Sequence, residues 1–182
     1  MTHATRAELE AGLDDIRQSP ADEGSVRLIV RRPEVGAREV LSEGELSLAD
    51  GLVGDTWKQR SSSRTSDGGA HPEMQLNLMN SRVVAVVAKA PERWPLAGDQ
   101  LFVDLDLSQD NLPPGTRLQL GTAVIEVTAE PHTGCAKFVE RFGLDAMKWV
   151  NSPTGRTLNL RGINAKVVEP GRVSRGDVVR KV

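Results

Sequence analysis

Short β-branched or apolar runs, separated by glycine- and proline-containing turns, constrain the fold of this chain more than any other feature. The runs that read as strands are 26–31, 38–42, 45–48, 74–78, 101–105, 117–120, 123–128, 159–161, 165–169 and 178–182. Helical patterns cover only 4–18, 81–90 and the segment from 136 to about 149. Many short strands with three modest helices predict a mainly β fold, a barrel or sandwich.

The chain length and the first residues predict the domain organisation. At 182 residues the chain is long enough for one domain with a sizeable core. Leu9, Leu13 and Ile16 have helical spacing, and the helix-breaking segment 19–24 follows them. We therefore predict an N-terminal helical extension over residues 1–25 and a single β domain over residues 26–182.

Charge and aromatic content limit the kinds of partner. The 23 basic and 25 acidic residues give a formal net charge of −2, which provides no global attraction for nucleic acid. With three Trp, three Phe and no Tyr, the sequence predicts no aromatic base-stacking surface. No apolar run reaches the roughly 18 residues that span a bilayer, and residues 1–10 carry no apolar signal core. We expect a cytoplasmic protein with a small-molecule substrate, without nucleic acid or membrane as partners.

Cys135 is the single cysteine, and its neighbours favour chemistry over packing. The preceding strand ends at Pro131, Gly134 permits a tight turn or a close approach to a ligand, and a helical pattern starts at Ala136. A helix start, with Lys137 nearby, favours the reactive thiolate. The alternative is a buried packing residue, because free cysteine is among the most buried residue types.

Other segments carry weaker signals. Residues 58–69 are polar, serine-rich and basic, which predicts a mobile surface loop whose arginines either cover an anionic ligand or keep the loop solvated. Asp55 follows Gly54 and is typical of a capped turn. His71 has no second His or Cys at ligand spacing, so the sequence predicts no zinc site.

Three further segments, in order around Cys135, carry a resemblance to a known family. They are Gly-Leu-Val-Gly-Asp at 51–55, Asn-Leu-Pro-Pro-Gly-Thr-Arg-Leu-Gln-Leu-Gly at 111–121, and Arg-Gly-Ile-Asn-Ala at 161–165 followed by Glu-Pro-Gly at 169–171 and Gly-Asp at 176–177. With them the chain resembles the MOSC family, the C-terminal domain of molybdenum cofactor sulfurases, over roughly residues 26–182. The resemblance implies a MOSC-type β-barrel with a few short helices, in a stand-alone bacterial-type member.

The resemblance also implies a function. In oxidoreductase members the cysteine matching Cys135 supplies a thiolate to molybdenum in the pterin cofactor, and family analogy suggests reduction of N-hydroxylated compounds. One cysteine cannot hold a four-thiolate cluster, so electrons would come from a partner. One alternative is a sulfur carrier with a persulfide on Cys135, any pyridoxal phosphate being on a partner cysteine desulfurase. The other is a non-catalytic binding domain. Ala136 and the long loop 57–72 depart from the family pattern and leave the substrate open.

These arguments give one set of candidate site residues. Cys135 is the predicted molybdenum ligand. His132, expected to be exposed in its loop, is predicted either to act at the site, as a donor to a ligand oxygen or a proton shuttle, or to be a structural histidine bonded to its own loop. Arg161 is expected either to grip a phosphate or to form an ion pair with Asp99. Asn111 is expected either to hold a turn or to bond the pterin. The predicted cofactor-binding residues are Arg161, Lys137, Asn111, Gly134 and Arg64.

Overall fold

Eleven strands and six α-helices form the structure, a computed structural model that describes residues 2–182. The strands are β1 (Glu23–Arg31), β2 (Glu39–Leu41), β3 (Glu43–Ser47), β4 (Gly51–Leu52), β5 (Leu76–Asn80), β6 (Leu101–Asp104), β7 (Arg117–Leu120), β8 (Ala123–Val127), β9 (Ile163–Glu169), β10 (Gly171–Ser174) and β11 (Val178–Lys181). The α-helices are α1 (Arg6–Ala11), α2 (Leu13–Arg17), α3 (Ser81–Ala88), α4 (Ala136–Phe142), α5 (Leu144–Val150) and α6 (Pro153–Thr157). The 3₁₀ helices are η1 (Thr56–Gln59), η2 (Pro72–Met74) and η3 (Pro91–Ala97).

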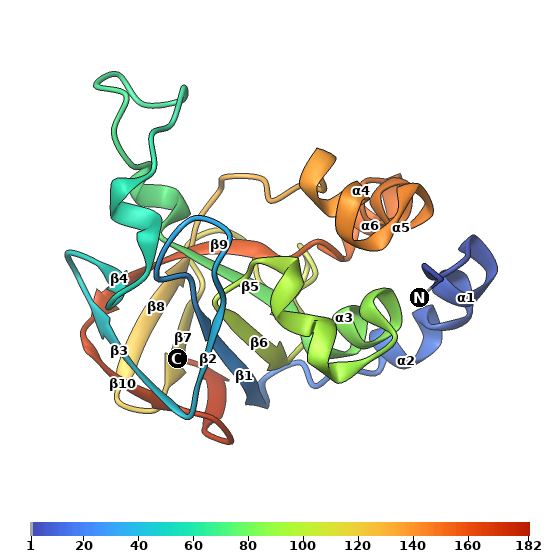
Figure 1. Ribbon diagram of the computed structural model, residues 1–182. Coiled ribbons are helices and arrows are strands. Elements are labelled where there is room, and N and C mark those ends of the chain that lie inside the picture. The colour runs from blue at the N-terminus through green and yellow to red at the C-terminus, as the bar shows by residue number, and fades with distance from the viewer. Residues whose placement is uncertain (1) are drawn as a thin grey trace.

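Seven strands close into a barrel, with the helices gathered on one side of it (Figure 1). Their order is β11-β7-β8-β9-β5-β6-β1, and a β11–β1 pairing closes the ring. Only the β5–β6 pairing in this ring is parallel. The short strand β2 extends the sheet beyond β1, and β10, β3 and β4 form a small second sheet. The predicted barrel with short helices is confirmed.

Alternating burial along the strands explains the two hydrophobic clusters. In β8, Ala123, Ile125 and Val127 point into the barrel while the residues between them are partly exposed. In β5 both faces are buried, because Leu78 joins the barrel interior and Met79 packs against the helices. The helical cluster therefore rests on the outer face of the barrel rather than forming a separate core.

The helices are more numerous and more broken than the sequence pattern predicts. Gly143, with φ +91°, separates α4 from α5 at the expected break. Helix α6 and η3 were not predicted, and the predicted strand 159–161 is wrong because that segment is a turn. Asn159 has φ +49° and Gly162 has φ +117°, which an extended strand does not allow.

The N-terminal helices pack on the same side as α3 and α5. Leu9 and Ile16 are buried in the helical cluster. Strand β1 starts at Glu23, so the predicted boundary at residue 25 falls inside a barrel strand. No helix among residues 2–182 is both long and apolar enough to cross a membrane.

Candidate functional site

The loop between β8 and α4, residues 128–135, positions the cysteine. Cys135 is the N-cap residue of α4, with extended backbone at φ −128° and ψ −178°. The prediction that Cys135 opens a helix is therefore confirmed. Its thiol is exposed, which excludes the alternative of a buried packing residue.

Gly134 holds this loop against the helices. Its N–H donates to Asn151 Oδ1 at 2.8 Å, and its carbonyl accepts from Asn151 Nδ2 at 3.0 Å. A Cβ atom at this position would lie 3.1 Å from Val150 and 3.2 Å from Met147. Glycine here lets the loop pack tightly on α5, which fixes the position of the neighbouring Cys135. Ligand contact by Gly134 stays a prediction.

Four arginines from distant parts of the chain converge on the end of η3 and the residue after it. Each donates to a different one of four successive carbonyl oxygens. The pairs are Arg38 Nε with Pro95 at 3.1 Å, Arg141 Nη1 with Leu96 at 2.8 Å, Arg161 Nη2 with Ala97 at 2.9 Å and Arg32 Nη1 with Gly98 at 3.0 Å. A carbonyl orients a guanidinium group but does not neutralise its charge. We call these four residues and Arg60 the arginine cluster.

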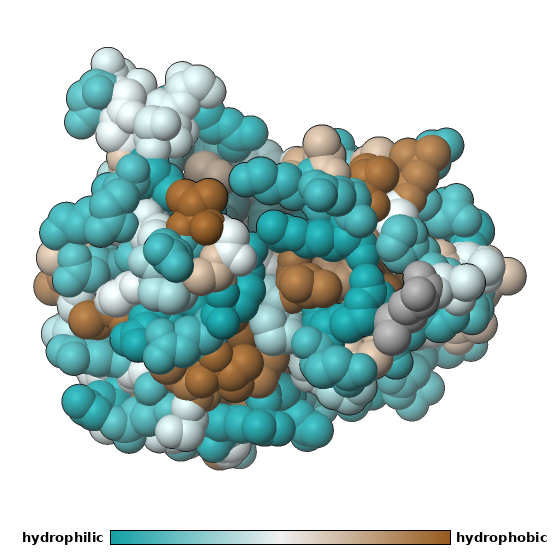
Figure 2. Space-filling view, in the orientation of Figure 1, coloured by the Kyte–Doolittle hydropathy of each residue, from teal (hydrophilic) through white to brown (hydrophobic). Residues whose placement is uncertain are grey.

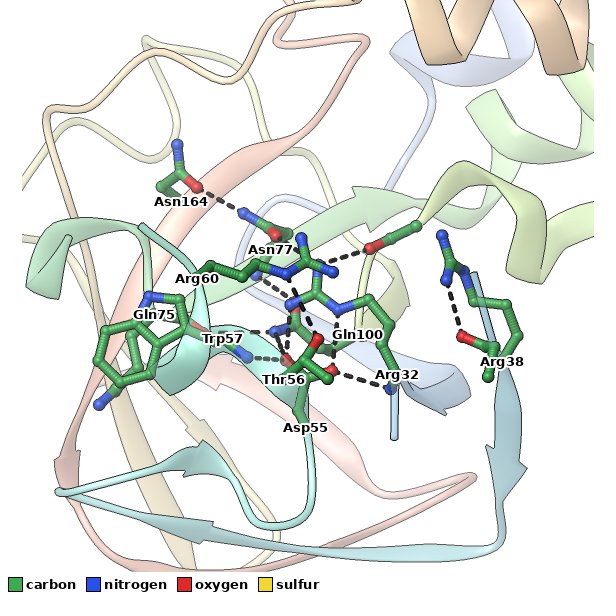
Figure 3. A network of polar contacts seen from close by, with 12 residues as sticks. Arg32, Arg38, Asp55, Thr56, Trp57, Arg60, Gln75, Asn77, Gln100 and Asn164 are labelled. Atoms are coloured by element: carbon green, nitrogen blue, oxygen red, sulfur yellow. Dashed lines mark hydrogen bonds and ion pairs between the residues drawn. The ribbon is translucent and has the colours of Figure 1, made fainter. Parts of the chain in front are cut away.

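The cluster carries surplus positive charge. Arg60, which follows η1, lies beside Arg32 in Figure 3 and donates to Thr56 Oγ1 at 3.3 Å. Burial, and then the neighbouring guanidinium groups, lower the pKa of Arg38 and lower that of Arg60 to about 10. The five arginines of the cluster are charged at neutral pH, and only two carboxylates, those of Asp55 and Asp99, lie among them to balance that charge. Such a group attracts an anion and can bind it through forked hydrogen bonds.

The first buried ion pair of the cluster is fully bonded (Figure 3). Asp55 Oδ1 accepts from the backbone N–H and Nε of Arg32, and Oδ2 accepts from Nη2 at 2.7 Å. Oδ2 also accepts from Gln100 Nε2 at 3.2 Å and from the N–H of Trp57 at 3.0 Å, which caps η1 as predicted. Burial alone would raise the pKa of Asp55, but the bonds and charge of Arg32 lower it overall.

The second buried ion pair is only partly bonded. Arg161 Nη1 donates to Asp99 Oδ2 at 2.7 Å, so the ion pair foreseen as the alternative role of Arg161 is present. Within residues 2–182, Asp99 Oδ1, Arg161 Nε and His132 Nδ1 are buried without a hydrogen-bond partner. The Arg161 guanidinium also lies 5.0 Å from the centroid of the Phe138 ring, on α4. Contact of Arg161 with a phosphate stays a prediction.

His132 is not exposed, which corrects the expectation from its loop position. Only 14% of its side chain is accessible, and Nδ1 lies 3.6 Å from Asp99 Oδ1. The ring has room here because residue 162 is a glycine. A Cβ at Gly162 would come within 3.3 Å of His132 Nδ1. Burial, then the charges of Arg161 and Arg32, lower the pKa of His132 well below 6.5, so the imidazole is neutral.

Two predicted basic residues lie at the edge of the site. Lys137 is exposed on the first turn of α4. Arg64 donates to Glu130 Oε2 at 2.9 Å and thereby ties the loop 58–69 to the cysteine loop. For both Lys137 and Arg64, contact with the cofactor stays a prediction.

Asn111 lies in a different environment. Its Nδ2 donates to the carbonyls of Ala21 and Asp106, and its Oδ1 accepts from Lys181 Nζ. This is the turn-holding role foreseen as the alternative, and it occupies both ends of the amide.

His71 Nδ1 accepts from the N–H of Glu73, and no group of three His, Cys, Asp or Glu in the described part of the chain has metal-binding geometry.

The surface between these parts is recessed. Figure 2 shows this face hollowed between the projecting loop 58–69 and the helices α4–α6. The arginines come from elements that border the hollow: Arg60 follows η1, Arg38 precedes β2 and Arg141 is on α4. Sequence reasoning missed Arg32, Arg38 and Arg141, because they belong to separate segments and no local pattern marks them.

The residues of the recess fit a molybdenum pterin cofactor. A cysteine sulfur is a soft ligand that suits molybdenum, and Cys135 is accessible. A pterin phosphate needs local positive charge, which the arginine cluster supplies although the whole chain is slightly acidic. Arg141 and Phe138 on α4 link the cluster to the helix that Cys135 begins.

Solved structures with the same fold support the barrel assignment. YuaD from Bacillus subtilis has a TM-score of 0.60 and 15% identity, covering 86% of this chain and 94% of its own. YiiM from Escherichia coli has a TM-score of 0.55 and 22% identity, covering 87% and 69%. YiiM from Geobacillus stearothermophilus has a TM-score of 0.53 and 12% identity, covering 90% and 74%. At these identities the likeness shows the fold alone.

A family profile gives the affiliation of the chain. Among proteins with curated functions, none matches it. The profile described as "MOSC domain" matches residues 66–180, which include the cysteine loop, β9 and most of β11. This family is associated with the molybdenum cofactor. Since the match spans more than half of the sequence and the barrel agrees with it, the chain belongs to the MOSC domain family.

Proposed function

We propose that this protein binds the molybdenum cofactor, with Cys135 as the thiolate ligand of the metal and the arginine cluster as the site of the phosphate. The observation that carries the proposal is the surplus guanidinium charge that α4 links to an exposed cysteine at its start. Arg38 and Arg141 donate only to carbonyl oxygens among the described residues, so their charges remain available to an anion.

The parts of the chain would contribute in different ways. Arg38, Arg60 and Arg141 would contact the phosphate, at about 1.5–3 kcal/mol for each charge-assisted hydrogen bond. Arg32 and Arg161 are more deeply buried and would add charge from behind. When bound, the cofactor would supply two-electron redox chemistry. The protein would orient it and hold it at the recess.

We further propose that the reaction is the reduction of N-hydroxylated compounds, in which an N–O bond breaks and the oxygen leaves as water. Two electrons and two protons are needed. A single cysteine cannot hold a four-thiolate iron–sulfur cluster, so the electrons would come from a separate electron-transfer protein.

Metal and pterin content test the proposal directly. Wild type, Cys135→Ser and the surface control Arg175→Gln are purified from a cofactor-competent host supplied with molybdate. We expect molybdenum and pterin fluorescence in wild type and control, and loss of most molybdenum in Cys135→Ser. Wild-type protein without molybdenum and without pterin would contradict the proposal.

The exposure of Cys135 also favours a second function, in which the thiol carries sulfur as a persulfide. Any pyridoxal phosphate would then belong to a partner cysteine desulfurase. Intact mass spectrometry after incubation with such an enzyme and cysteine separates the two functions. One stable added sulfur, absent from Cys135→Ser, would support the carrier, and an unchanged mass would oppose it.

A further inference from the structure

A second depression, with different chemistry, lies against the cysteine loop. It is a cavity of about 540 Å³, within the range of small-molecule sites. Val127, Val150 and Ile163 supply apolar wall. The amide residues Asn151, Asn159, Asn164 and Gln109 also line it. His132 forms part of the same wall.

The charges that line this cavity are mixed in sign, unlike those of the arginine cluster. Glu130 is paired with Arg64, and Arg156 Nε donates to the carbonyl of Asn151 at 3.1 Å. Asp110 adds a further acidic group to the lining. A cavity of this kind does not favour a phosphate. It favours an uncharged molecule that can exchange hydrogen bonds with its walls.

The surroundings of His132 determine which of its two ring nitrogens is unprotonated and can accept a hydrogen bond from a ligand. Nδ1 is buried and faces Asp99 Oδ1, and neither atom has another hydrogen-bond partner in the described chain. A neutral imidazole carries one proton, and a proton on Nδ1 serves both atoms after a small closure of the 3.6 Å separation. Burial raises the pKa of Asp99, and the charge and hydrogen bond of Arg161 limit that rise. Nε2 then keeps its lone pair on the accessible part of the ring.

We propose that Asp99 holds His132 as the Nδ1–H tautomer, and that Nε2 accepts a hydrogen bond from the O–H of an uncharged small molecule in this cavity. Asp99 is a positioning residue, held in turn by Arg161. The binding test below uses an N-hydroxyl compound as its probe, and only that choice rests on the proposed function. The tautomer and the acceptor role follow from the residues described above.

The tautomer is tested by ¹⁵N NMR on protein with labelled histidine rings, with the His132 signals assigned by their loss in His132→Gln. We expect a protonated Nδ1 and an unprotonated Nε2 in wild type. Asp99→Asn should invert this pattern, because Arg161 turns the amide oxygen toward itself and the amide N–H₂ toward Nδ1. A wild-type ring protonated at Nε2, or an Asp99→Asn ring with the wild-type pattern, would overturn the proposal.

The acceptor role is tested with two uncharged probes, benzohydroxamic acid and its O-methyl ether, which lacks the hydroxyl donor. We expect wild type to bind the hydroxyl probe about tenfold more tightly, as for one lost hydrogen bond. His132→Gln should bind the two probes within about twofold of each other. Equal binding of both probes by wild type, or binding of neither, would overturn the acceptor role.

These measurements do not depend on the metal. Binding and ring protonation are read from the protein as isolated, whatever its molybdenum content. Protein that lacks molybdenum but shows the expected tautomer and probe preference would refute the proposed function and support this inference. Molybdenum-loaded protein without them would do the reverse.

Discussion

Two buried arginine–aspartate pairs lie next to the same segment of chain, residues 95–100, but they are built differently. In the Arg32–Asp55 pair Arg32 donates to both carboxylate oxygens, and Gln100 and Trp57 also donate to Asp55. In the Arg161–Asp99 pair one carboxylate oxygen and one guanidinium nitrogen have no partner among residues 2–182.

This difference indicates that the Arg32–Asp55 pair stabilises the fold, whereas the Arg161–Asp99 pair serves function. A buried polar network that is fully bonded fixes one conformation, whereas unbonded buried groups are costly and need another reason to persist. The pKa directions agree with this division. The fold favours the carboxylate of Asp55, whose pKa is lowered, and disfavours that of Asp99, whose pKa is raised by burial.

The largest expected effect is on the fully bonded pair. Arg32→Ala would leave the Asp55 carboxylate buried without its cation, and we expect the free energy of unfolding in urea to fall by about 3–5 kcal/mol. Arg31→Ala is the matched control at the adjacent residue, because Arg31 pairs with Glu39 at the surface. That control should cost at most about 1 kcal/mol. Equal losses in the two variants would contradict the structural role of Arg32.

The next effect concerns the arginines that bond only carbonyls. Arg38→Gln and Arg141→Gln should each weaken retention of the phosphate-bearing cofactor about tenfold to a hundredfold, since each removes one charge-assisted contact. Their melting temperatures should change little. Arg175→Gln, a distant exposed arginine, should retain the cofactor like wild type. Undiminished retention in both cluster variants would remove the phosphate site from this region.

The pH dependence of stability should separate the two pairs. Asp55 has a lowered folded pKa, so its contribution is present above the ordinary value of 3.8 and is lost as pH falls through the folded value. His132 also has a lowered folded pKa, so stability declines as pH falls below 6.5, where only the unfolded state takes up the proton. Asp99, with a raised pKa, acts in the opposite direction just above 3.8. Urea titrations at a series of pH values should show that Asp55→Asn lacks the loss of stability at acidic pH. His132→Gln should lack the decline of stability below pH 6.5.

The smallest effect belongs to the tether between the two loops. Arg64→Gln breaks a largely exposed pair with Glu130 and should lower the free energy of unfolding by at most about 1 kcal/mol. Cofactor retention should fall less than in Arg60→Gln, because Arg60 lies in the cluster. The reverse order of retention would move the ligand contact toward the tip of the loop 58–69.

Local sequence patterns predicted the parts of this protein that local forces determine. Alternation in β8, the helix start at Cys135 and the break at Gly143 could all be read from neighbouring residues. The arginine cluster could not, because its members meet only through carbonyls that the folded barrel brings near them. The burial of His132 was also missed, since a loop position does not reveal that Gly162 leaves room for the ring.

The most direct test of the contrast is the free energy of urea unfolding of Asp55→Asn and Asp99→Asn at pH 7. Both changes are isosteric and each removes one buried charge. We predict a loss of at least about 3 kcal/mol for Asp55→Asn, because the amide presents N–H₂ to Arg32 where an acceptor is needed. Asp99→Asn should cost less, because only Oδ2 of Asp99 is bonded and the amide oxygen can keep that bond with Arg161. Equal losses, or a larger loss for Asp99→Asn, would contradict the account.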